Sequence, residues 1–103
     1  MRYTVWVSPQ AQGEITDAAA YIALDSPANA EGWLRRVEDA IASLAEMPRR
    51  CPVARESPMG GREYRQLVVG SYRVLFAILQ ETVAVVHVRH AHRREAGPDD
   101  LAF

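Results

Sequence analysis

Two Ser-Pro pairs, each followed by a regular apolar spacing, constrain the fold of this chain more than any other feature. A serine side chain accepts hydrogen bonds at a helix start, and proline is tolerated in the first turn because its missing N–H would have no partner there. After Ser8-Pro9 and again after Ser26-Pro27, apolar residues recur at the spacing of one helix face: Ala11, Ile15, Ala18 and Ile22, then Ala30, Leu34, Val37, Ile41 and Leu44. Two amphipathic helices joined by so short a turn are expected to pack as an antiparallel hairpin, the first ending near residues 24–25 and the second stopped by Pro48.

Short β-branched and aromatic runs flank this hairpin. One precedes it at residues 3–8, and three follow a loop rich in proline and glycine at residues 48–61: residues 62–69, 72–79 and 82–90. The breaks at Gly70-Ser71 and Gln80-Glu81 are short enough for tight hairpins. The order β-α-α-β-β-β predicts an α+β domain in which the helical hairpin packs on one face of a small, mainly antiparallel sheet.

Length and composition limit the class of protein. A chain of 103 residues is expected to form one domain around one modest core. No apolar run approaches the roughly 20 residues of a membrane span, and the N-terminus lacks the pattern of a secretion signal. The single cysteine, Cys51, excludes an internal disulfide, so we expect a cytoplasmic protein with no membrane association.

The near-neutral net charge of −1 hides an uneven distribution along the chain. Residues 1–48 carry seven acidic side chains and three arginines, whereas residues 49–94 carry nine arginines and three glutamates. A basic half on a near-neutral domain indicates an anionic partner.

The segment VVHVRHAHRR, residues 85–94, holds all three histidines and invites a metal-site interpretation. Strand alternation puts His90 and His92 on one face and His87 on the other, whereas a zinc site needs roughly three or four protein ligands. The neighbouring arginines would also repel a divalent cation, so no metal site is expected. His87 lies among valines and is predicted to be a core residue, and the thiol of Cys51 is predicted to have a mildly depressed pKa because arginines precede it.

Four segments in order resemble the RelE/ParE toxin superfamily. YTVWVSPQAQGEITDAAAYI is similar to its first strand and helix, and SPANAEGWLRRVEDAIASLAEMP to its second helix. REYRQLVVGSYRVLFAI resembles an arginine-bearing strand followed by the Tyr-Arg-Val strand of the family, and VAVVHVRHAHRR its basic last strand. The resemblance covers one toxin domain at residues 1–94 and leaves residues 95–103 as a C-terminal tail.

This resemblance implies the toxin of a bacterial type II toxin–antitoxin pair, in a hetero-oligomer with a small antitoxin of the ParD kind or similar, and without a cofactor. RelE-like members cleave mRNA on the ribosome, and ParE-like members inhibit DNA gyrase. A long helical hairpin, Leu67 in place of a catalytic lysine, and the lack of a base-stacking tyrosine after Arg94 favour the ParE-like branch. The alternatives are RelE-like cleavage and a degenerate module that only binds an antitoxin.

Aligned on Tyr72-Arg73, the resemblance also nominates site residues. If the protein is an mRNA endoribonuclease, its catalytic residues would be Arg65, Arg73, His90 and Arg93, with histidine as the acid or base and arginine binding phosphate. As partner- or target-binding residues, the candidates are Arg65, Arg73, Arg89, His92, Arg93 and Arg94, together with Tyr21 and Trp33, which otherwise belong to the core. Arg65 and Arg73 can equally be ordinary solvated strand residues.

Overall fold

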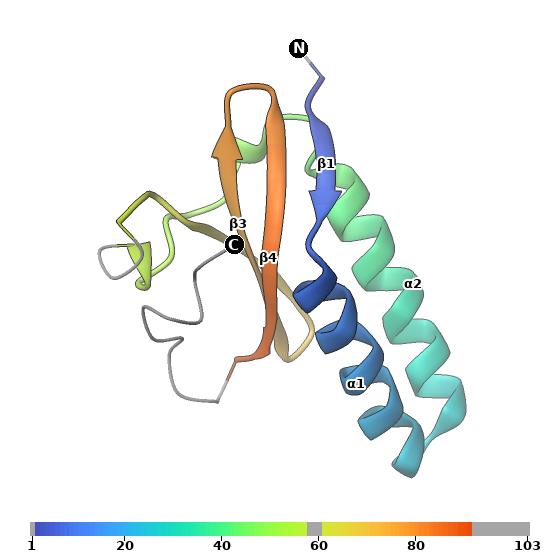
Figure 1. Cartoon of the computed structure of the whole chain (residues 1–103). Helices are drawn as coiled ribbons and strands as arrows, with labels where there is room; N and C mark the ends of the chain where they lie inside the picture. The colour runs from blue at the N-terminus through green and yellow to red at the C-terminus, as the bar shows by residue number, and fades with distance from the viewer. Residues whose placement is uncertain (1, 58–60, 92–103) are drawn as a thin grey trace.

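The computed structural model describes residues 2–57 and 61–91 and arranges them as two layers, a helical hairpin against a four-stranded sheet (Figure 1). The predicted β-α-α-β-β-β order is confirmed. The elements are β1 (Thr4–Val7), α1 (Pro9–Asp25), α2 (Pro27–Ser43), a short 3₁₀ helix η1 (Pro48–Arg50), β2 (Arg65–Val69), β3 (Tyr72–Leu79) and β4 (Thr82–His90). The predicted tail at residues 95–103 lies outside the described residues, so the domain boundary near residue 94 stays a prediction. Among the described residues, no helix is both long and apolar enough to cross a membrane.

Both helices start as the Ser-Pro pairs predict. Ser8 Oγ accepts a hydrogen bond from Ala11 N at 3.0 Å, and Ser26 Oγ accepts one from Asn29 N at 3.2 Å. The second helix ends at Ser43, earlier than the predicted stop at Pro48. Its continuation through residues 44–46 is bonded to the third residue back instead of the fourth, so the chain tightens into 3₁₀ geometry before the proline is reached.

The sheet has the strand order β1-β4-β3-β2, with β1 parallel to β4 and the other neighbours antiparallel. Two-residue turns join β2 to β3 and β3 to β4, and the first residue of each turn has positive φ: 60° at Gly70 and 57° at Gln80. Glycine adopts this conformation without strain, whereas Gln80 adopts it at a cost. The predicted limits of β3 and β4 are confirmed, but β2 begins at Arg65 because Tyr64 bonds to the preceding loop, through Ser57 and Ala54, instead of to β3.

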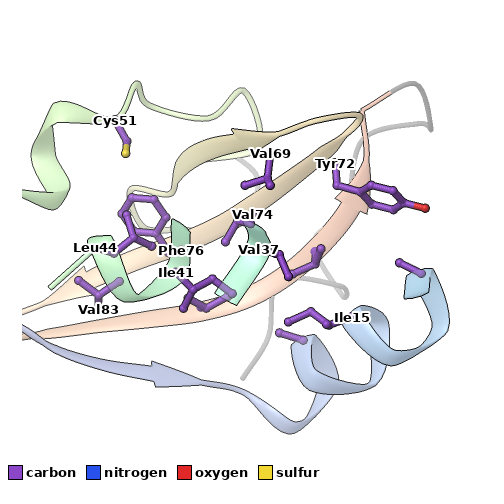
Figure 2. Packing of buried hydrophobic residues seen from close by; sticks show 14 of the residues in the cluster. Ile15, Val37, Ile41, Leu44, Cys51, Val69, Tyr72, Val74, Phe76 and Val83 are labelled. Carbon is purple, nitrogen blue, oxygen red and sulfur yellow. The ribbon is translucent and has the colours of Figure 1, made fainter. Parts of the chain in front are cut away.

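The main core lies between the hairpin and the sheet. Figure 2 shows Phe76 of β3 pointing toward Leu44 and Ile41, with Val37 beside Val74; the ring of Tyr72 lies toward the end of the hairpin where α1 and α2 are joined. Because side chains alternate along a strand, residues between these point to the other face. There a smaller buried cluster lies under the loop that follows η1: Ala54, Tyr64, Leu75, Ala77 and Val86.

Beyond the end of the β1–β4 pairing, Ser8, which caps α1, and Glu14 of α1 bond to the backbone of β4. Beyond the β1 pairing, which ends at Val85, Ser8 Oγ donates to Val86 O at 3.2 Å. Glu14 then accepts a hydrogen bond from Val88 N at 2.9 Å, and its carboxylate lies 3.1 Å from His87 Nδ1 and 3.2 Å from Arg89 Nε. An unpaired buried N–H costs about 1–3 kcal/mol, so Glu14 stabilises the strand edge and ties the hairpin to the sheet.

We therefore predict that Glu14→Ala lowers the free energy of unfolding by about 2 kcal/mol, because Val88 N–H and the side chain of Arg89 lose their acceptor. Urea denaturation followed by circular dichroism measures the loss. Asp17→Ala, which removes an exposed carboxylate one turn further along α1, is the matched control and should change stability by no more than about 0.5 kcal/mol. Equal stability of the two variants would contradict the role given to Glu14.

Candidate functional site

A hollow of about 800 Å³ lies between the helical hairpin, the start of β3 and the end of β4. Its aromatic wall is a row of rings: Trp33 and Tyr72 have centroids 4.9 Å apart, and Tyr72 and His90 have centroids 5.2 Å apart with edge-to-face geometry. Arg36 from α2 lies over Gly70 in the β2–β3 turn; a Cβ at this position would make only an ordinary contact of 3.5 Å with Arg36 Nη2, so glycine is favoured there by its positive φ and not by lack of room.

A second hollow of about 390 Å³ shares Tyr21, Tyr72 and His90 with the first and continues along α1 to Arg89. We call the two together the hairpin groove. Tyr21 stands between them with 67% of its surface exposed. The ring of Tyr72, labelled in Figure 2, lies toward the end of the hairpin where α1 and α2 are joined.

The groove brings together three of the residues nominated from sequence for partner or target binding, Tyr21, Trp33 and Arg89, and adds His90, which was nominated as a catalytic residue. Trp33 belongs to the floor, since only 3% of its surface is exposed, and its Nε1 has no hydrogen-bond partner among residues 2–57 and 61–91. Tyr21 is the exposed member. The groove therefore offers a partner aromatic surface flanked by charges of both signs: Arg35, Arg36 and Arg89 against Glu14, Asp17 and Asp39.

Arg73 is turned into the protein and is not displayed for binding. Its guanidinium makes a bidentate pair with Glu56, at 2.8 Å and 2.6 Å, and also donates to Gln66 Oε1 at 3.0 Å and 2.8 Å. Arg73 is 5% exposed and Glu56 is fully buried. The role of Arg73 in binding a target or an RNA phosphate stays a prediction, and in this arrangement an external anion would have to displace a buried carboxylate.

Arg65 is also engaged within the protein. It donates to Cys51 O at 2.6 Å and to Arg49 O at 3.2 Å, and its Nη2 lies 2.9 Å from Glu63 Oε1. These bonds hold the loop after η1 against the start of β2. The residue remains partly exposed at the edge of a small hollow that is separate from the hairpin groove.

The candidate nuclease residues do not converge on one site. Arg65, Arg73 and His90 line three different hollows. The remaining nominated residues, Arg93 together with His92 and Arg94, lie outside the described residues. In the described part of the chain no group of three histidine, cysteine, aspartate or glutamate side chains is placed to hold a metal ion.

Burial determines the surroundings of His87 and the pKa of Cys51 and of Tyr64. His87 is fully buried, as predicted for a core histidine, with Nδ1 on Glu14. The predicted pKa depression of Cys51 is wrong: burial raises the pKa of its thiol, and the positive charges of Arg50 and Arg65 only partly oppose this. Burial likewise raises the pKa of Tyr64, against the charge of Arg62.

Two acidic residues that organise this region were not identified from sequence. Glu14 falls three residues after Ala11 and four before Ala18, so its place beside the buried face of α1 was readable from the helical period. Glu56 lies in an irregular loop with no period, and nothing in the sequence pairs it with Arg73. Glu14 pairs with Arg89 and Glu56 with Arg73, so two arginines of the basic half of the chain are neutralised within the protein.

Comparison with known proteins places this geometry in a family. The family model described as the ParE toxin of the type II toxin–antitoxin system parDE matches residues 5–95. A solved structure, the chromosomal ParDE TA system from P. aeruginosa, superimposes with a TM-score of 0.71 at 13% sequence identity, covering 88% of this chain and 98% of that chain. No curated protein matches the sequence. At that identity the structural similarity shows a shared fold alone, but the family model spans nearly the whole chain and agrees with the resemblance seen in the sequence. The chain belongs to the ParE toxin family of type II toxin–antitoxin systems.

Proposed function

We propose that this protein inhibits DNA gyrase by binding, without cleaving RNA, and that a cognate antitoxin neutralises it. The observation that carries the first half is the inward orientation of Arg73. This residue aligns with the phosphate-binding arginine of RelE-like nucleases, yet its guanidinium is bonded to Glu56 and Gln66. The guanidinium that would bind phosphate in a RelE-like nuclease is thus bonded to side chains of the protein itself.

The chemistry of RNA cleavage argues in the same direction. Cleavage requires an acid, a base and a cation around one phosphate, within hydrogen-bond reach of the reacting atoms. Among the described residues, His90 lies in the hairpin groove, whereas Arg65 lies in a separate hollow beside Arg49. Arginine itself is a poor general base because its pKa exceeds about 12. A protein that acts by occupying its target needs no such convergence.

Expression of the toxin without its antitoxin tests the target. We expect the SOS response and cleaved chromosomal DNA with intact mRNA, and inhibition of supercoiling when purified toxin is added to gyrase. Primer extension on cellular mRNA provides the opposing measurement. Cuts in the ribosomal A site without SOS induction would refute the proposal, and a chain that leaves growth, DNA and mRNA unchanged would support the degenerate-module alternative.

Substitution of the Arg73–Glu56 pair separates a structural role from a catalytic one. Arg73→Met alone leaves the carboxylate of Glu56 buried without its partner and should cost about 3–5 kcal/mol, with loss of toxicity through unfolding. The double variant Arg73→Met/Glu56→Leu removes both charges and should recover most of that stability and the toxicity. Thermal denaturation and growth assays of both variants measure this. A folded double variant without toxicity would show that the guanidinium itself acts on the target.

The hairpin groove is the surface we assign to the antitoxin. It joins exposed aromatic area to charges of both signs: Tyr21 lies with Tyr72 and His90, and Arg36 and Asp39 line the same hollow. An amphipathic segment that carries an apolar anchor and charged residues of both signs fits this combination. A small antitoxin with such a segment would bury Tyr21, one of the most exposed aromatic side chains of the described surface.

Tyr21→Glu should therefore weaken neutralisation by at least about tenfold without destabilising the toxin, because the residue is exposed and its loss removes a central aromatic contact. Co-expression with the neighbouring antitoxin gene and titration of the purified pair measure the effect. Met47→Glu, at an exposed apolar position at the other end of the hairpin, is the control. Unchanged antitoxin affinity in Tyr21→Glu would exclude the groove as the binding surface.

A further inference from the structure

A separate hollow of about 320 Å³ lies at the opposite end of β3 from the hairpin groove. Arginines from three segments meet at it: Arg49 from η1, Arg62 from the loop and Arg65 from the start of β2. Its floor is the end of β3, residues 77–79. We call it the arginine hollow.

Strand pairing leaves a backbone donor facing the arginine hollow. The β2–β3 pairing starts at Arg65 opposite Phe76, so the last residues of β3 extend beyond β2. The two-residue turn makes Leu79 and Thr82 the hydrogen-bonded pair of the β3–β4 hairpin, and the backbone of Ile78 therefore points the other way, toward the missing part of β2. Within the described chain, no backbone hydrogen bond joins Ile78 to residues 61–64.

The charges of the arginine hollow favour an anion. Three guanidinium groups face one carboxylate, that of Glu63, which lies 2.9 Å from Arg65 Nη2. Arg49 and Arg62 are exposed residues at the rim, while Arg65 is fixed by backbone carbonyls. Planar guanidinium groups beside a backbone N–H form the donor set that binds phosphate oxygens.

We propose that the arginine hollow binds a backbone phosphate of duplex DNA. The site is open and its two rim arginines are exposed side by side, which suits a chain of phosphates better than a single ion held by full enclosure. The choice of DNA rests on the proposed function, since gyrase works on a DNA duplex. The toxin would then contact the enzyme–DNA complex through DNA as well as through protein.

The test uses the full-length toxin, purified free of antitoxin, and a short fluorescent duplex of mixed sequence. Anisotropy titrations between about 50 and 200 mM salt should give weak binding that falls steeply with salt. Arg49→Gln and Arg62→Gln should each weaken binding several-fold and reduce the magnitude of the log–log salt slope by about 1, the value for one phosphate contact. Glu63→Gln should tighten binding, because it removes the carboxylate of the hollow.

Arg2→Gln is the matched control: it also removes one exposed arginine, but from the chain next to β1, at the other edge of the sheet. Equal weakening by Arg2→Gln and the hollow variants would show an effect of net charge alone and overturn the site. Binding of inorganic phosphate with no measurable binding of the duplex would overturn the assignment to DNA in favour of a free anion. Gyrase inhibition is measured separately: inhibition without DNA binding refutes only the hollow, and DNA binding without inhibition refutes only the proposed target.

Discussion

The contacts of Glu14 determine how the two layers of this protein meet. The parallel pairing of β1 with β4 ends at Val85, so the second half of β4 presents an edge with unpaired backbone groups. Such edges invite pairing with other strands and are usually blocked. Here the helix does the blocking, because Glu14 accepts from Val88 N and Ser8 Oγ donates to Val86 O. The strand edge is satisfied without a further strand.

The hairpin groove exists because α1, and not a further strand, lies beside the end of β4. A strand beside the end of β4 would fill the space next to α1, whereas a helix whose Glu14 carboxylate replaces the strand pairing leaves a hollow on either side of Tyr21. The ring row from Trp33 through Tyr72 to His90 then forms its wall. The feature assigned to antitoxin binding is therefore a consequence of where a four-residue strand ends.

Sequence reasoning predicted the elements well because their signals are local. Ser8 and Ser26 cap the helices through bonds to residues three positions on, and short turns fix β3 and β4. The site was harder to predict because its decisive contacts are between distant residues. Arg73 looked available, but its partner Glu56 lies seventeen residues away in a loop without periodicity. The prediction of a lowered pKa for Cys51 was wrong for a related reason: the sequence shows the adjacent arginines but not the burial, whose effect on the pKa is larger.

The basic half of the chain is consequently much less of an anion-binding surface than its composition indicates. Arg73 and Arg89 are paired with carboxylates, and Arg50 donates to the carbonyls that follow α2. Positive charge facing solvent is concentrated instead where β2 is too short to cover the end of β3, with Arg49 and Arg62 at the rim. This hollow and the hairpin groove lie at opposite ends of β3. A partner in the groove therefore need not cover the hollow, and the same small domain has room for a neutralising protein at one end and for an anionic contact at the other.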